Sequence, residues 1–317
     1  MAEVTELNRS HFNNEASNYD SKFQKTIQQL TEAIQERLDF IGVDWVVDED
    51  DGNDQGSTSG GTATASVPSR EVRLLDYACG TGLMSRALAP YTTQCVGVDI
   101  SENMVGVYNA TARNQGLTEE EMHAVVGDVT VPEDPSPAAL SAPHFFDFDV
   151  AVLGLGFHHF ADPPLAAKRL VERLRPGGVL LILDFVTHEP IVKQQQQQGQ
   201  DQDHDGHGHG HHGHSHGHGH SNDKAFHNAA HTVTHHGFSE SQMKGIFEAA
   251  GAGRKFAFQE MGSGVVFTHG SGKEGSKRRV FLARGRRRYR SGGLSLDSGV
   301  IGAYLSLAEP QAVDKNK

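Results

Sequence analysis

A glycine-rich turn between an apolar strand and a helix carries the clearest chemical signal in the sequence. The strand near 72–76 ends at Asp76, and Ala78, Gly80 and Gly82 follow before a helix begins at Leu83. Small residues leave backbone N–H groups and a helix N-terminus open to a ligand, because no bulky side chain blocks the approach. This arrangement predicts a binding site for a nucleotide-like cofactor.

Two classes of cofactor fit such a turn. Residues 80–85 are close to the dinucleotide fingerprint, and Asp99 lies near the place of a ribose-binding acid. Asp76 favours the other class, because a carboxylate there would repel the pyrophosphate of NAD or FAD. It would attract an ammonium and a sulfonium, by roughly 1 to 4 kcal/mol for a 4 Å pair. S-adenosylmethionine carries both cations and is the predicted cofactor.

Short apolar strands alternate with helical segments after Glu71, which is typical of parallel strands joined by helical crossovers. Strands are expected near 72–76, 95–99, 123–127, 148–153, 179–185, 255–260 and 279–284. Helices are expected near 83–90, 102–115, 162–174 and 240–250, with Ser101 and Ser239 as N-caps. Apolar residues at helical spacing also predict a helix over 20–41.

Five motifs follow one another at intervals that resemble the class I S-adenosylmethionine-dependent methyltransferases, in their small-molecule, ubiquinone-biosynthesis-like branch. They are LLDYACGTG (74–82), VGVDIS (96–101), VVGDV (125–129), FDVAVLGLGFHHF (148–160) and LRPGGVLLILDF (174–185). The resemblance implies a Rossmann-like α/β fold. Its doubly wound, mostly parallel seven-stranded sheet would have an antiparallel last strand and helices on both faces. The family most often has glycine at position 78, and alanine fits there if φ stays negative.

The resemblance also implies which residues bind the cofactor. Asp99 would hold the ribose hydroxyls, and Asp128 with the Val129 N–H would hold the adenine, which Ile100 and Met104 would sandwich. Asp76 and Gly80 would lie against the methionine end. The full expected set is Tyr19, Asp76, Ala78, Gly80, Gly82, Asp99, Ile100, Met104, Asp128, Val129, Leu153 and Gly154.

The loop after the fourth expected strand is predicted to line the methyl-transfer zone. Gly154 would allow close backbone approach there. His158 or His159 could take a proton from an acceptor hydroxyl, since an imidazole suits that task near neutral pH. The alternative is that one histidine fixes the loop and neither is a base, because alignment and exclusion of water contribute much of methyl-transfer catalysis.

The chain divides into five parts by composition. Residues 1–47 form an N-terminal helical lid segment in which Tyr19 would cover the methionine end, with a buried structural role as the alternative. Residues 48–68 are an acidic, Gly/Ser/Thr-rich connector, and 191–227 are a Gln/His-rich insert. The methyltransferase domain covers 69–190 and 228–288, and 289–317 form a tail.

Nine histidines between 204 and 220 could collect transition metals incidentally, but glycine spacing gives no fixed catalytic site, so no metal is predicted. The net charge of −12 disfavours nucleic acid as a partner, although a basic run near 277–290 could bind it or act as a nuclear address. The presence of only two cysteines predicts a reducing compartment. Because the sequence has no run of ~18 apolar residues, no membrane span is predicted. We expect a cytoplasmic protein, with the nucleus as an alternative.

The predicted function is methyl transfer from S-adenosylmethionine to an oxygen, nitrogen or carbon of a small molecule. A protein or nucleic-acid methyltransferase is the alternative among enzymes. The sequence lacks the Asn/Asp-Pro-Pro-Tyr/Phe signature of amino-directed nucleic-acid methyltransferases, which counts against this alternative. A metal-handling or scaffold protein that keeps the fold without catalysis is the alternative outside enzymes.

Overall fold

The computed structural model describes residues 2–46, 70–187, 232–262, 264–267 and 276–289. The predicted connector over 48–68 and the insert over 191–227, including its histidines, lie outside these residues, as does the tail from 290.

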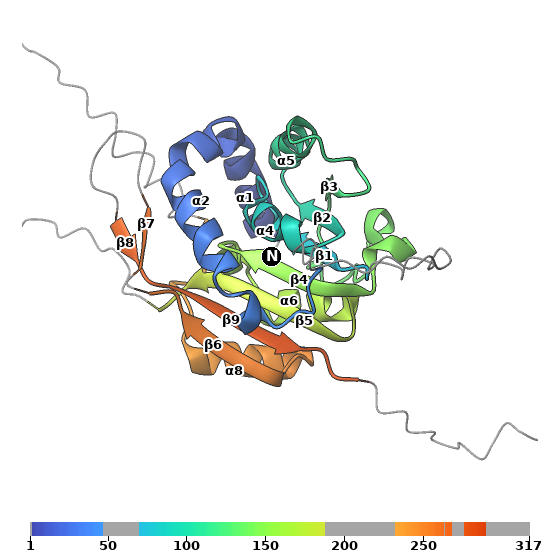
Figure 1. Ribbon diagram of the computed structural model, residues 1–317. Coiled ribbons are helices and arrows are strands. Elements are labelled where there is room, and N and C mark those ends of the chain that lie inside the picture. Colours follow the sequence, from blue (N-terminus) through green and yellow to red (C-terminus); the bar gives the residue numbers. More distant parts are fainter. Residues whose placement is uncertain (1, 47–69, 188–231, 263, 268–275, 290–317) are drawn as a thin grey trace, which may run out of the picture.

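Seven strands form one sheet in the order β3-β2-β1-β4-β5-β9-β6 (Figure 1). They are β1 (Arg73–Tyr77), β2 (Gln94–Asp99), β3 (Met122–Val126), β4 (Phe148–Gly154), β5 (Leu174–Phe185), β6 (Arg254–Glu260) and β9 (Val280–Arg286). The strands β1 to β5 are parallel to one another, and β9 runs antiparallel to both β5 and β6. The Rossmann-like sheet and its antiparallel last strand are confirmed.

Both faces of the sheet are buried, which explains the nearly continuous apolar character of its central strands. In β4, Val150 and Val152 join one core, while Ala151 and Leu153 join the other. The first core packs against α2 (Tyr19–Gln35), α4 (Leu83–Leu88) and α5 (Glu102–Asn114). The second packs against α6 (Pro163–Arg173) and α8 (Glu240–Ala250).

Side-chain caps set the ends of the crossover helices at the expected residues. Ser101 Oγ accepts a hydrogen bond from the Met104 N–H at 3.1 Å and begins α5. Ser239 begins α8 with a reciprocal capping box, and Gly251 ends it with φ +86°. Short 3₁₀ helices lie at Ala16–Asn18, Ala89–Tyr91, Ala138–Leu140, Pro143–Phe145 and Phe157–His159.

The N-terminal region differs from its prediction. The single helix expected over 20–41 is two, α2 and α3 (Leu38–Ile41), and a further helix, α1 (Ala2–Glu15), precedes them. The buried residue of α1 is polar, Asn8, so the sequence carries no apolar stripe to reveal this helix. In Figure 1, α1 and α2 lie together over the end of the sheet near α4 and α5.

A second, two-stranded sheet was not expected either. It pairs β7 (Val265–Phe267) with β8 (Ser276–Arg278) in antiparallel fashion. The Thr26 hydroxyl of α2 donates to the Val266 carbonyl at 2.8 Å, so this hairpin lies against α2. Within the described part of the chain, no helix combines the length and apolar content needed to cross a membrane.

Candidate functional site

A cavity of about 970 Å³ lies at the carboxyl ends of the parallel strands, where ligands bind in open α/β sheets. Its walls come from the glycine-rich turn, the loops after β2, β3 and β4, and the helices α1 and α2. Most of the expected site residues line it: Tyr19, Ala78, Gly80, Asp99, Ile100, Met104, Asp128, Gly154, His158 and His159. Asp76, Gly82, Val129 and Leu153 do not line it.

Asp99 closes β2 and presents its carboxylate to the cavity. Its Oδ2 accepts a hydrogen bond from the Gly80 N–H at 2.8 Å, and its Oδ1 accepts one from the Ser101 N–H at 2.9 Å. Burial raises the pKa of Asp99, and these two backbone N–H groups oppose the rise. Each carboxylate oxygen retains acceptor capacity, so both can still take a hydrogen bond from a ligand hydroxyl.

The glycine-rich turn offers open space at Gly80. A Cβ built on Gly80 would have no atom within 4 Å, so the chain leaves room for a ligand against this backbone. Ala78 departs from its expectation, because its φ is +52° rather than negative. The left-handed conformation costs a non-glycine residue about 1–2 kcal/mol, which explains why glycine would suit this position.

Asp76 lies beneath the turn rather than in the cavity wall. Only 1% of its surface is exposed, and its Oδ2 accepts hydrogen bonds from the N–H and hydroxyl of Ser85, at 3.0 and 2.8 Å. Burial raises the pKa of Asp76 to about 7, although the Ser85 hydrogen bonds oppose the rise. Its carboxylate therefore organises the start of α4, and Asp99 is the acid that faces a ligand.

Gly82 and Gly154 were expected to contact the cofactor, but in the structure close packing of neighbouring side chains requires glycine at both positions. A Cβ on Gly82 would lie 2.8 Å from the Tyr108 ring, and one on Gly154 would lie 2.5 Å from Cγ of Met84. Both neighbours are fully buried. Gly154 still lines the cavity, but the close approach that it permits is to the Met84 side chain.

The loop after β3 is held by a tyrosine that the sequence analysis did not single out. Tyr77 Oη donates to Asp128 Oδ1 at 2.9 Å and accepts the Val129 N–H at 3.0 Å. The expectation that this N–H binds adenine is therefore wrong in this structure, because Tyr77 already takes it. Asp128 Oδ1 also accepts from the Thr130 N–H and hydroxyl, at 2.8 and 2.6 Å. Its other oxygen has no partner among the described residues.

His158 forms a buried pair with Asp184, the acid at the end of β5. His158 Nδ1 lies 2.8 Å from Asp184 Oδ1, and the His158 backbone N–H donates to Oδ2 at 3.1 Å. An ionised carboxylate can only accept, so Nδ1 carries a proton, and in the neutral imidazole Nε2 is then the acceptor. Sequence reasoning missed Asp184, because it reads as the end of an apolar strand.

His159 has a different environment. Its Nδ1 donates to the Thr232 carbonyl at 2.9 Å, and its ring meets the edge of Phe12 at 5.3 Å between centroids. Burial and the neighbouring His158 hold the pKa of His159 well below its usual value, so its imidazole stays neutral at pH 7. These contacts tie the β4 loop to α1 and to the segment after the insert.

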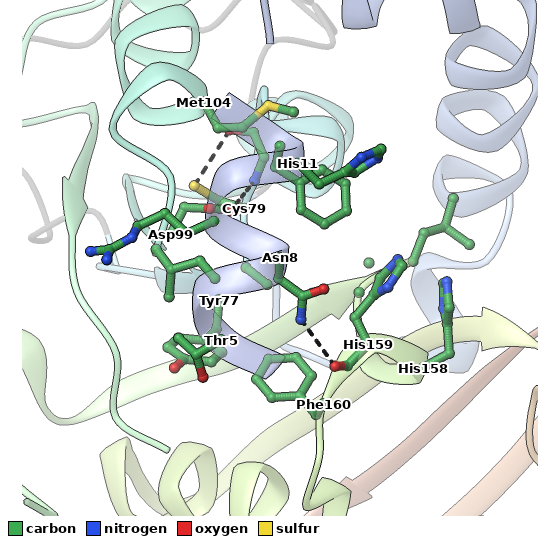
Figure 2. A pocket seen from close by; sticks show the side chains of 18 of the residues that line it. Thr5, Asn8, His11, Tyr77, Cys79, Asp99, Met104, His158, His159 and Phe160 are labelled. Carbon is green, nitrogen blue, oxygen red and sulfur yellow. Dashed lines mark hydrogen bonds between the residues drawn. The ribbon is translucent and has the colours of Figure 1, made fainter. Parts of the chain in front are cut away.

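The N-terminal helices cover the cavity (Figure 2). Asn8 Nδ2 donates to the His159 carbonyl at 3.2 Å, and Asn13 Oδ1 accepts from the Ser101 hydroxyl at 2.6 Å. Asp20 of α2 accepts from the Thr81 hydroxyl of the glycine-rich turn at 2.6 Å. It also pairs with Arg86 at 3.0 Å. Tyr19, at the start of α2, lines the cavity, and burial raises its pKa to about 12.

One end of the cavity is largely apolar. Side chains of α2 and of strands β5 and β7 contribute Phe23, Ile27, Leu30, Phe185 and Phe267 to its lining. His158 lies beside this end, with its ring 5.0 Å from the Phe185 ring. Among the residues that the structure describes, no cluster of three histidine, cysteine or acidic side chains could hold a metal ion.

The chain is similar to curated methyltransferases over part of its length. It is 35% identical over 113 residues to an uncharacterized methyltransferase of Schizosaccharomyces pombe, which is 36% of this chain and 38% of that protein. It is 30% identical over 134 residues to a demethylmenaquinone methyltransferase of Clavibacter sepedonicus, which is 42% of this chain and 49% of that protein. The chain thus spans less than half the length of these two relatives.

Solved structures with a similar fold include the YcgJ protein of Bacillus subtilis. It aligns with a TM-score of 0.44 and 18% identity, over 69% of this chain and 93% of that chain.

A family model described as a methyltransferase domain matches residues 27–252, more than half of the chain. The site fits the cofactor of such enzymes, because the open backbone at Gly80 and the acceptor oxygens of Asp99 lie in one cavity. The volume lies within the range of small-molecule and cofactor sites. The chain therefore belongs to the methyltransferase-domain family, with S-adenosylmethionine as its cofactor.

Proposed function

We propose that the chain transfers a methyl group from S-adenosylmethionine to a small-molecule acceptor, with His158 as the general base. The observation that carries this proposal is the buried His158–Asp184 pair at the apolar end of the cavity. Relatives named demethylmenaquinone methyltransferase and ubiquinone biosynthesis O-methyltransferase favour a small molecule over a macromolecule as acceptor.

The cofactor supplies a methyl group on a positively charged sulfur. Asp99 would accept hydrogen bonds from the ribose hydroxyls, and the free oxygen of Asp128 would accept from the adenine amine. His158 Nε2 would take the proton from an acceptor O–H or N–H. Asp184 would keep the imidazole in the required tautomer and stabilise it when protonated.

The helices α1 and α2 fit the same chemistry. Both contribute side chains to the cavity wall, and aromatic residues line its apolar end. Methyl transfer depends strongly on alignment of the two reacting atoms and on exclusion of water. His159 would position the β4 loop rather than act on the acceptor, because its contacts bind it to Thr232 and Phe12.

The test is a search for methylated products. The purified chain is incubated with S-adenosylmethionine carrying a deuterated methyl group and with a metabolite extract, and products are identified by mass spectrometry. We expect a compound to gain the labelled methyl. His158→Gln should slow that reaction by about 10²–10⁴-fold, the contribution of a general base. His123→Gln is the matched control, because His123 lies outside the cavity with its Nδ1 on the Glu119 carbonyl.

Two results would count against the proposal. If no small molecule gains the label, the acceptor assignment is wrong. If His158→Gln retains the full rate, the general base is wrong.

A further inference from the structure

Asn8 of α1 carries a buried polar atom without a partner. The residue is 7% exposed, and its Oδ1 has no hydrogen-bond partner within the described residues. The orientation of the amide is fixed, because Nδ2 must be the atom that donates to the His159 carbonyl. Oδ1 therefore faces away from that carbonyl as an unused acceptor.

The position of this acceptor points to a ligand. Asn8 lines the cavity, and Figure 2 shows its side chain extending from α1 toward His159. Leaving a buried acceptor unsatisfied costs about as much as losing a hydrogen bond, so folded proteins rarely tolerate it. A bound molecule that offers an O–H or N–H group would remove this deficit.

S-adenosylmethionine is the ligand that we consider for this acceptor, because Asn8, Asp99 and His158 line the same cavity. Five residues further along α1, Asn13 is anchored at the start of α5 by Ser101 Oγ and the Asn103 N–H, at 2.6 and 3.1 Å. That anchor adjoins Asp99, while Asn8 itself is anchored on the β4 loop. A cofactor that extended from Asp99 toward His158 would therefore lie near Asn8. S-adenosylmethionine offers ribose hydroxyls, an adenine amine and an ammonium as donors.

We propose that Asn8 is a cofactor-binding residue whose amide oxygen accepts a hydrogen bond from S-adenosylmethionine, so that α1 recognises the occupied site. This inference rests on the placement of the cofactor in this cavity. It assigns to α1 a direct contact with the cofactor, in addition to covering the cavity.

The test separates the acceptor oxygen of Asn8 from its donor nitrogen. Asn8→Leu removes both groups, whereas Asn8→Asp keeps an acceptor and loses the donor to His159. Asn14→Leu is the matched control, because Asn14 is an exposed residue of the same helix. Calorimetric titration uses S-adenosylhomocysteine, which keeps the hydroxyls and amines but lacks the sulfonium charge that would favour an added carboxylate. Thermal unfolding without ligand reports any purely structural effect.

We expect Asn8→Leu to bind S-adenosylhomocysteine about three- to tenfold more weakly than wild type, as for the loss of one hydrogen bond. Asn8→Asp should bind within about twofold of wild type, and Asn14→Leu should not differ from it. Equal weakening in both Asn8 variants would make the residue a structural donor and overturn the proposal. Unchanged binding in Asn8→Leu would also overturn it. Failure of the wild-type chain to bind would instead refute the cofactor assignment.

Discussion

Replacement of Gly82 by alanine should destabilise the fold because two costs coincide there. The backbone φ of +95° disfavours an L-residue, at about 1–2 kcal/mol. The new Cβ would lie 2.8 Å from the ring of Tyr108, which is fully buried and donates its hydroxyl hydrogen to Ser85 Oγ. Overpacking of this kind costs about 1–3 kcal/mol. We therefore expect Gly82→Ala to lower the free energy of unfolding by roughly 2–5 kcal/mol.

Gly80→Ala is the matched comparison, two residues away in the same turn. Its φ is +52°, so it carries the backbone cost, but its Cβ would meet no atom within 4 Å. The loss should be only about 1–2 kcal/mol. Because the added methyl enters the cavity, Gly80→Ala should weaken binding of S-adenosylmethionine more than Gly82→Ala does. Urea unfolding measures the stabilities, and calorimetry measures the affinities.

The two glycines differ in what an added Cβ would contact. Equal losses of stability in Gly80→Ala and Gly82→Ala would refute the role of Tyr108. If Gly82→Ala kept its fold but lost more affinity than Gly80→Ala, the placement of the ligand against the Gly80 backbone would be wrong.

Two further substitutions test the buried carboxylates. Asp184→Asn should lower kcat by about 10²–10⁴-fold with little change in KM, since an amide no longer fixes the His158 tautomer. Steady-state kinetics with the identified acceptor measures this effect, and an unchanged kcat would contradict the prediction. Asp76 has a pKa raised to about 7, so the stability it contributes is present below its unfolded pKa of about 4 and is lost as pH rises through 7. Relative to wild type, Asp76→Asn should therefore gain on the order of a few kcal/mol between pH 4 and 8 in urea unfolding, and a pH-independent difference would refute the raised pKa.

The sheet could be predicted because its strands are short apolar runs between turn residues. In β2 and β4 the expected bounds lie within one residue of the observed ones. Local signals were also sufficient for the caps at Ser101 and Ser239, where a hydroxyl side chain precedes a helical pattern. These features depend on interactions between near neighbours in the sequence.

Within the helical segment expected over 1–47, the bounds of α1 could not be predicted, because this helix covers the cavity and its buried residue is polar. Its one buried residue is Asn8, and Leu7 is 38% exposed, so apolar periodicity does not mark its inner face. The same holds for the hairpin of β7 and β8, whose strands have three residues each and depend on contact with α2.

Within the site, the missed features are contacts between residues distant in sequence. Tyr77 takes the Val129 N–H across the sheet, and Asp184 meets His158 only because β5 lies beside β4. Asp99 and Gly80 line the same cavity, since they lie at the carboxyl ends of adjacent parallel strands. Motif spacing was thus sufficient to bring these two residues together, while the partners of the histidines required the strand order.

Direct titration of the chain with S-adenosylmethionine tests the central claim, that this cavity binds the adenosyl cofactor through Asp99. We predict saturable binding by the wild-type chain, no competition by NAD, and at least a hundredfold weaker binding by Asp99→Ala. That figure corresponds to two hydrogen bonds to a charged group at about 1.5 kcal/mol each. Asp39→Ala, at an exposed position on α3, should bind as wild type does. Binding of NAD in place of S-adenosylmethionine, or full affinity in Asp99→Ala, would contradict the account.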